Sequence, residues 1–366
     1  MNLNISAVGM VSALGLDWET SCAASRAGIS QSAAINYYRV QAGDPWEVQF
    51  VTAHQATLLT QGFEGDGRLL RLLGGAFADL RRRAPANVGE LPVFLSLPGP
   101  SGATLDDDAV EDDTGEPSPA RTTDERADDL LNRAAQLGKW QGRVRLAGVS
   151  TAGHTGFAEA LQSCFSALTD QGLDSALVGA VDSLLDDETL GSLNDAKRLK
   201  HPAAPTGLVP GEAAVIFSVS RASIREQDVL CTVNALDFAD QDQHFESDNA
   251  PNGKGLSAAI IQVAQREKWP GSDSPWILSD HNGEGYRAGD WGHTVHRLVG
   301  QDPAFAETHI SFPAVSFGDT RAASGSVAAA CAVAAWKRGY APAARCCIVS
   351  SSDAGRRAAF LVGRPN

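Results

Sequence analysis

Two short polar turns hold the residues that are best suited to chemistry. The first turn reads Ser-Thr-Ala-Gly-His-Thr-Gly over 150–156 and contains His154, and the second reads Gly-Asp-Thr-Arg over 318–321 and contains Asp319. Each turn precedes a segment that predicts a helix. A helix N-terminus can hold an oxyanion or lower the pKa of a thiol, and an imidazole paired with a carboxylate can act as a general base. We therefore expect a site at these two turns.

The elements that must position these turns form a repeat. Each turn lies between a small-residue strand and an Ala-rich helix, and a second strand follows that ends in Ser or Asp. Ala-rich helices pack at close range, which suits a helix buried between layers, and apolar strands joined through a helix favour parallel pairing. The two units are about 165 residues apart, which indicates an internally duplicated α/β fold with its join near 220–227. The predicted elements are strand 144–149, helix 157–169 and strand 175–181 in the first unit, and strand 314–317, helix 322–338 and strand 345–350 in the second.

Hydrophobic periodicity predicts five further elements before the first unit, and these surround one segment of different composition. Residues 98–123 are acidic and rich in Gly, Pro, Ser and Thr, which predicts a mobile surface loop. Asp106, Asp107, Asp108, Asp112 and Asp113 lack the alternating spacing of a calcium loop, so we do not expect calcium there. The other elements are strand 3–11, helix 18–27, helix 67–83, strand 92–97 and helix 124–137.

Composition excludes several classes of protein. The 366 residues include 30 Lys+Arg and 44 Asp+Glu, for a net charge of −14, and 43% are hydrophobic. This composition is globular, and the acidity argues against nucleic acid or an anionic membrane surface as a partner. No signal peptide, membrane span or metal-binding cysteine spacing is visible, so we expect a cytoplasmic protein with no cofactor and no metal. We expect its six scattered cysteines to be reduced and buried: Cys22, Cys164, Cys231, Cys331, Cys346 and Cys347.

Three blocks of the sequence resemble elongating β-ketoacyl-[acyl-carrier-protein] synthases of the thiolase superfamily. These are SAVGMVSALGLDWETSCAASRAGIS at 6–30, the block from DSALVGAVDS to GLVPGEAAVIF at 174–217, and SFGDTRAASG at 316–325. The resemblance covers nearly the whole chain and is weakest over 98–123 and 235–270. It implies a five-layer α-β-α-β-α sandwich built from two similar halves, here 1–222 and 223–366, and normally found as a dimer.

The resemblance also implies a Cys-His-His site for condensation, and this chain departs from it. A cysteine at a helix N-terminus would take the acyl group from acyl carrier protein, and two histidines would assist decarboxylation and stabilise the oxyanion. Alignment from the left places Gly153 at the nucleophile position, and alignment from the right places His154 there. Cys164 lies about three turns into the helix and cannot substitute.

The two histidine positions differ in how well they match. His281 best matches the first histidine, in the family's "AHGTxTxxGD" block, whereas Asp319 stands at the second, in the "GHxxGAAG" block. A carboxylate at that position would repel a developing oxyanion. In addition, the family's glycine-rich "GFGGxN" loop is replaced by Ser-Ser-Ser-Asp-Ala-Gly at 350–355.

Two functions follow as expectations. The first is a ketosynthase-fold protein that has lost condensation and acts as a non-condensing partner or acyl-binding subunit in fatty-acid or polyketide-type metabolism. It would form a homodimer or a heterodimer with a ketosynthase, with acyl carrier protein as a further partner. The alternative is an active acyltransferase, 3-oxoacyl-ACP synthase-like enzyme or thioester hydrolase that works with His154, His281 and Asp319.

Overall fold

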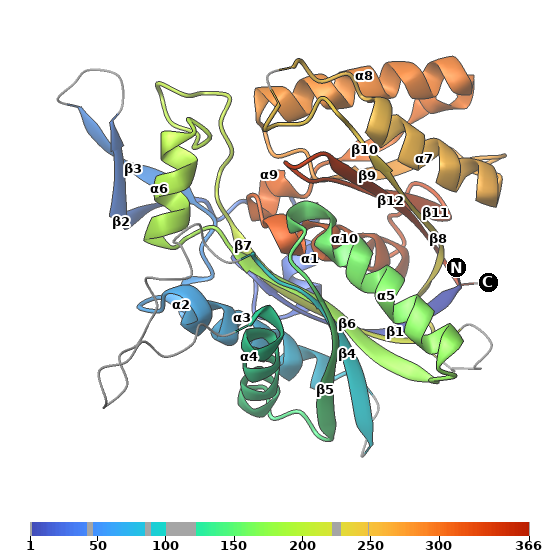
Figure 1. Cartoon of the computed structure of the whole chain (residues 1–366), viewed down its shortest axis with the longest axis horizontal. Coiled ribbons are helices and arrows are strands. Elements are labelled where there is room, and N and C mark those ends of the chain that lie inside the picture. The colour runs from blue at the N-terminus through green and yellow to red at the C-terminus, as the bar shows by residue number, and fades with distance from the viewer. Residues whose placement is uncertain are drawn as a thin grey trace.

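The chain folds around one ten-stranded sheet, as a computed structural model shows for residues 2–41, 47–84, 89–99, 122–221, 228–247 and 249–365 (Figure 1). The strand order is β10-β9-β11-β12-β8-β1-β7-β6-β4-β5. The strands are β1 (Leu3–Ser12), β4 (Glu90–Ser96), β5 (Arg143–Ser150), β6 (Ser175–Ser183), β7 (Glu212–Arg221), β8 (Cys231–Asp240), β9 (Trp276–Ser279), β10 (His309–Ser311), β11 (Arg345–Ser351) and β12 (Arg356–Gly363).

The sheet repeats one topology twice, as the duplication in the sequence predicts. The order β5-β4-β6-β7-β1 corresponds strand by strand to β10-β9-β11-β12-β8. In each half the first three strands pair in parallel and the remaining pairs are antiparallel. A short antiparallel ladder, in which Leu3 pairs with Val233, joins the halves through β1 and β8. The proposed division near 222 falls within 222–227, outside the described residues.

Five layers of helix and sheet result (Figure 1). One hydrophobic cluster joins α5 and α10 to strands of both half-sheets, so these two helices form the central layer. A second cluster packs α3 and α4 on the outer face of the first half, and a third packs α7 and α8 on the second. The predicted α-β-α-β-α sandwich is thus confirmed. The helices are α1 (Trp18–Arg26), α3 (Gly65–Arg81), α4 (Thr123–Leu137), α5 (Gly156–Asp170), α7 (Lys254–Glu267), α8 (Gly285–Gln301) and α10 (Ser324–Lys337).

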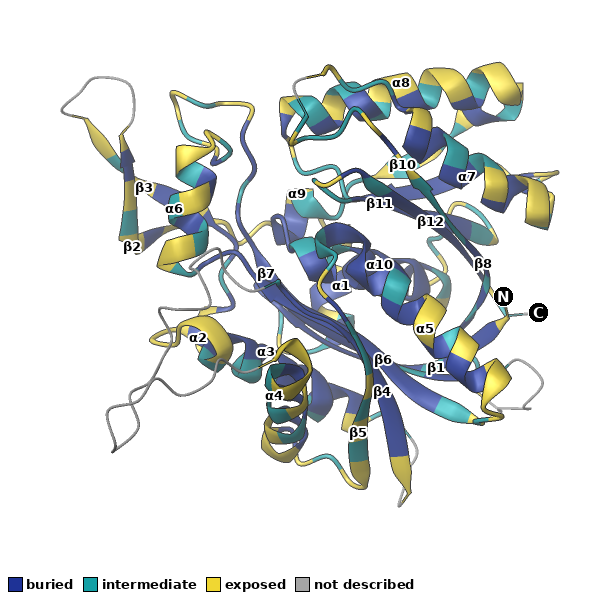
Figure 2. Ribbon diagram, in the orientation of Figure 1, coloured by how far each residue is buried: buried dark blue, intermediate teal, exposed yellow. Residues whose placement is uncertain are grey.

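The central layer explains why α10 is so rich in alanine. Ten of its fourteen residues are buried, and Figure 2 shows it dark blue between the two halves of the ten-stranded sheet. Because a helix covered on most sides has little room for large side chains, small residues let both sheets approach it closely.

One predicted strand is wrong. Residues 314–317 form a short helix, α9 (Ala314–Phe317), instead of the strand before α10. Pro313, with φ −55°, starts this helical turn, and Gly318, with φ +73°, ends it in a conformation that favours glycine. The strand that corresponds to β5 is β10, which lies earlier in the chain and has only three residues. Val315, which suggested a buried strand, has a side chain that is 73% exposed.

The other predicted elements are confirmed within a few residues at each end. Strands β7, β8, β9, β10 and β12 and helices α7 and α8 had not been predicted. A small hairpin and two short helices had not been predicted either. The hairpin packs on α6 through a separate apolar cluster and projects from the body of the molecule (Figure 1). These elements are β2 (Ala33–Gln41), β3 (Val48–Ala53), α2 (Thr57–Thr60) and α6 (Asp187–Asp195).

Other sequence predictions have mixed outcomes. The acidic stretch over 100–121, with the rejected calcium residues, lies outside the described residues. Five of the six cysteines are buried, and Cys331 is partly exposed. No helix among the described residues is both long and apolar enough to cross a membrane.

Candidate functional site

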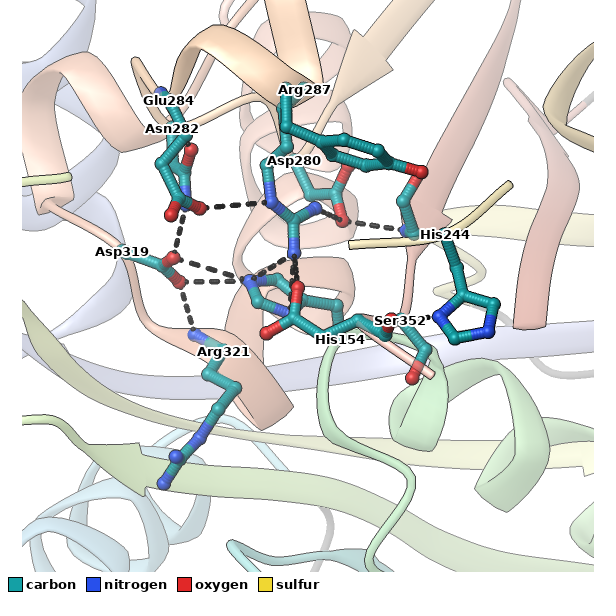
Figure 3. A network of polar contacts seen from close by, with 12 residues as sticks. His154, His244, Asp280, Asn282, Glu284, Arg287, Asp319, Arg321 and Ser352 are labelled. Carbon is teal, nitrogen blue, oxygen red and sulfur yellow. Dashed lines mark hydrogen bonds and ion pairs between the residues drawn. The ribbon is translucent and has the colours of Figure 1, made fainter. Parts of the chain in front are cut away.

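The two predicted turns meet in the central layer, where His154 and Asp319 contact each other (Figure 3). His154 lies in the short 3-10 helix Gly153–Thr155 that leads into α5, and Asp319 follows α9. Nε2 of His154 lies 3.0 Å from Oδ1 of Asp319. Both side chains are almost fully buried. The duplicated topology therefore brings together residues that are 165 positions apart.

The carboxylate of Asp319 is surrounded by hydrogen-bond donors. Nδ2 of Asn282 donates to Oδ2 at 2.6 Å, and the backbone N–H of Arg321 donates to Oδ1 at 2.8 Å. Burial alone would raise the pKa of Asp319, but His154, Arg287 and the Asn282 hydrogen bond outweigh it and hold the pKa well below its ordinary value. Asp319 is therefore a stable buried anion.

A guanidinium also contacts the His154 ring. Nη2 of Arg287 lies 3.1 Å from Nδ1 and 3.4 Å from Nε2 of His154. Because the carboxylate of Asp319 only accepts hydrogen bonds, Nε2 donates its proton to Asp319, and Nδ1 accepts from Arg287. Both ring nitrogens of His154 are thus engaged within the protein.

Arg287 belongs to a wider set of ion pairs that joins the two halves of the fold. Its guanidinium pairs with Asp280 at 3.1 Å and with Asp353 at 3.0 Å. Arg198, from the loop after α6, binds Glu284 at 2.6 Å and the same Asp353 at 2.8 Å. Such buried groups are stable only as a complete network, because removing one member leaves an unpaired charge.

Gly153 occupies a special backbone position beside Arg321. Its φ is +59°, a left-handed conformation, and a Cβ added there would lie 3.9 Å from Cγ of Arg321. Arg321 has a φ of +35°, and its guanidinium makes two hydrogen bonds to Asp182, at 2.9 and 3.2 Å. Backbone conformations of this kind cluster at functional sites.

His281, the third predicted site residue, does not join this network. Its ring packs edge-on against Phe312, with ring centroids 5.2 Å apart. Its Nδ1 is buried and has no hydrogen-bond partner among the described residues. Burial lowers the pKa of His281. Asn282, the next residue, instead contacts Asp319.

Two residues of the site were missed from the sequence, although a signal for one of them exists. When Asn282 takes the histidine position of the family's "AHGTxTxxGD" block, Gly283, Gly289 and Asp290 match the motif without a gap. Placing His281 there requires an insertion of one residue. Arg287 had no such signal, because it falls at a position that the motif leaves unspecified.

The space beside Asp319 is small. A cavity lined by Ser279, Phe317, Asp319, Thr320 and neighbouring residues has a volume of about 10 Å³. A single water needs about that much space, so this cavity cannot hold an acyl chain.

The described residues supply little that could replace the missing nucleophile. Cys164 is buried within α5, and burial raises the pKa of its thiol to about 12. No group of three or more His, Cys, Asp or Glu side chains in the described ranges could hold a metal ion.

Comparisons with known proteins show the fold. Neither a family model nor a curated protein sequence matches the chain. Many solved structures match it, among them three that cover its full length. The type II polyketide synthase complex AntDE:AntF, an acyl-carrier protein with its ketosynthase bound to the hexaketide, has a TM-score of 0.75 at 12% identity, with 99% of that chain covered. The ishigamide ketosynthase/chain length factor has a TM-score of 0.73 at 15% identity, also with 99% covered.

The third structure is a ketosynthase from module 6 of the bacillaene synthase of Bacillus subtilis 168. It has a TM-score of 0.73 at 13% identity, with 72% of that chain covered. These identities are low, whereas the structural agreement extends over the whole chain. This chain therefore has the thiolase-like fold of the ketosynthases and chain length factors of polyketide synthases.

Proposed function

We propose that this chain is a non-condensing ketosynthase-fold subunit that acts as a partner in fatty-acid or polyketide-type metabolism. The observation that carries the proposal is the contact between Asn282 and Asp319 beside Gly153 and His154. By the resemblance, Gly153, Asn282 and Asp319 occupy the places of the cysteine and the two histidines. Glycine offers no nucleophile, and a buried carboxylate opposes an oxyanion instead of stabilising it.

The partner is a second ketosynthase-fold chain. One matching structure is described as a ketosynthase/chain length factor, which supports pairing of this kind. The free edge of β5 favours the same conclusion, because β5 pairs only with β4 and ends the sheet of the described residues. An eight-residue edge strand offers unpaired backbone groups to another strand. We propose that β5 pairs with its counterpart in a homodimer or a heterodimer.

The alternative function is an active acyltransferase, 3-oxoacyl-ACP synthase-like enzyme or thioester hydrolase. Support for it comes from the His154–Asp319 pair, which resembles the base and its orienting carboxylate in hydrolases. Against it stand Arg287, which contacts the nitrogen that would accept a proton, and the small volume of the cavity beside Asp319, about 10 Å³. His281 packs against Phe312 and is not placed to assist.

A condensation assay tests the proposal. The purified protein is incubated with acyl-loaded and malonyl-loaded carrier protein, and an active ketosynthase serves as the positive control. We expect no 3-oxoacyl product above the rate without enzyme. Product formation that is lost in Asp319→Ala would show instead that this site still condenses.

A further inference from the structure

A basic surface lies at the end of α10 opposite the site. α10 begins just after Arg321 and has 14 residues, so it spans about 21 Å. α1 and α3 end near the same point, at Arg26 and Arg81. Between these helix ends lie two adjoining hollows, of about 610 and 200 Å³, which share Glu19, Ala23 and Arg338. We call this region the helix-end surface.

Positive charge dominates the helix-end surface in a chain whose net charge is −14. Its cations are Arg26, Arg82, Arg83, Lys337 and Arg338, and its carboxylates are Asp17 and Glu19. Basic residues in the last turn of a helix ordinarily offset the dipole, which amounts to about −0.5 charge at each C-terminus. Asp79, which lies beneath Arg82 and Arg83, adds a third carboxylate, and Glu19 pairs with Lys337 at 2.7 Å. The remaining excess of two cations still exceeds the roughly −1.5 charge of three helix C-termini, so the surface stays positive.

Internal contacts hold these cations in place. Arg83 and Arg82 bond to the carboxylate of Asp79, which is buried and also accepts the backbone N–H of Trp18 at 2.8 Å. The ammonium of Lys337 lies 5.0 Å from the centre of the Trp18 ring. Because these side chains are already ordered, binding would cost less conformational entropy than it would for free surface lysines.

Several charged groups also remain open to solvent. The side chains of Arg82, Lys337 and Arg338 are 53%, 45% and 55% exposed. Ile29 adds an apolar contact, with 47% of its surface exposed. Exposed charges around an apolar residue are the arrangement of a protein interface, with a polar rim and an apolar contact.

We propose that the helix-end surface binds an acidic segment of a partner protein. The cations spread over three helix ends and two hollows, which suits several carboxylates along a polypeptide better than one small anion. Charges of this type steer association and set its salt dependence more than they add affinity. This proposal does not depend on whether the His154 site is active.

A labelled deca-glutamate peptide tests the proposal by fluorescence anisotropy. An acidic protein should repel such a peptide unless it has a localised basic site. The variant Arg82→Glu/Lys337→Glu/Arg338→Glu reverses three exposed cations of this surface. Its matched control, Arg133→Glu/Lys200→Glu/Lys254→Glu, changes net charge equally at exposed positions elsewhere.

We expect the native protein to bind the peptide at 50 mM salt and to lose affinity at least tenfold at 300 mM. The helix-end variant should bind at least tenfold more weakly, and the control should stay within about twofold of native. Absence of binding by the native protein, or an equal loss in both variants, would overturn the proposal. So would displacement of the peptide by inorganic pyrophosphate at concentrations near the peptide's Kd, because the site would then be one for small phosphates.

Discussion

At residue 319, where the resemblance implies a histidine, an aspartate sets the electrostatics of the site. Its carboxylate accepts hydrogen bonds from His154, Asn282 and the backbone of Arg321. These donors suit a permanent anion, whereas condensation needs donors aimed at a transient oxyanion. We propose that Asp319 thereby forms part of a structural ion-pair network at the place where the resemblance implies catalysis.

Asp319→Asn tests how much this network stabilises the fold. The variant leaves Arg287 and its neighbours without one buried negative charge, and removing one partner of a buried ion pair typically costs about 3 to 5 kcal/mol. We expect a loss of about 3 kcal/mol in the free energy of unfolding by urea. Asp273→Asn is the control, because its pair with Arg345 is partly exposed and should contribute less than about 1 kcal/mol. Equal effects of the two substitutions would contradict the account.

The free energy of unfolding should also depend on pH, and Asp319 should account for part of this dependence. The pKa values of Asp319 and Asp353 are held below their ordinary value of 3.8 by neighbouring cationic groups, despite burial. Near pH 4 these two carboxylates therefore become protonated in the unfolded chain but stay ionised in the folded chain. Their contribution to the free energy of unfolding is thus present above that pH and is lost as the pH falls below it. Urea unfolding of native protein and Asp319→Asn between pH 7 and 3 should give curves that converge as pH falls. A constant difference between them would be inconsistent with this assignment.

The sequence predicted part of this site, and the limits have physical causes. His154 and Asp319 were predicted to lie together because a duplicated topology places equivalent turns at the same point. Arg287 was not predicted. The sequence of a helix does not indicate which of its side chains will reach a ring that is distant in the chain. Asn282 could have been predicted from the ungapped motif. His281 was preferred because it is the residue type that the motif has at this position.

At the scale of elements, hydrophobic periodicity predicted α1, α3, α4, α5, α10 and several buried strands, whereas no prediction was made for α7, α8, β7, β8 or β12. It failed at 314–317, because a four-residue apolar run is compatible with either a strand or a helical turn. Pro313 and Gly318 favour the helical turn, because they lie at its start and its end. The hairpin of β2 and β3 was missed because half of its residues are exposed and its apolar pattern is short.

The turn before α5 supplies a prediction at this scale. Gly153→Cys restores a thiol at a helix N-terminus beside Arg321, and both features lower the pKa of a thiol. The left-handed φ should cost about 1 to 2 kcal/mol of stability. Gly172→Cys is the matched control, because its φ is +68° with nothing near its Cβ. We expect similar destabilisation in both variants, but alkylation by iodoacetamide at a lower pH for Gly153→Cys, read by mass. Identical pH profiles would argue against an activating turn.

At the scale of the whole molecule, two similar halves meet across one interface. The ion pairs of Arg198 with Glu284 and Asp353 cross that interface, as does the contact of Arg287 with His154, where the resemblance places catalysis. The fold class was predicted from sequence blocks that resemble the ketosynthases, because those blocks lie in the buried layers. The dimer that the resemblance implies stays a prediction, and we propose the exposed edge of β5 as its interface.

Val144→Pro tests that edge. The backbone N–H of Arg143 bonds back to Gly89, so the N–H of Val144 points to the free side of β5. Proline removes this donor while leaving the ladder to β4 intact. If β5 pairs in a homodimer, sedimentation should show a shift to monomer with little change in melting temperature. A native dimer that persists in Val144→Pro would place the interface elsewhere.

The most direct test of the central claim is the intact mass of the protein after incubation with acyl-loaded and malonyl-loaded carrier protein. Because Gly153 has no nucleophile and His154 is bound on both ring nitrogens, we predict an unchanged mass and no loss of thioester from the carrier. A stable acyl adduct, or thioester turnover, that disappears in His154→Ala or His281→Ala would contradict the account and show that the protein is an enzyme.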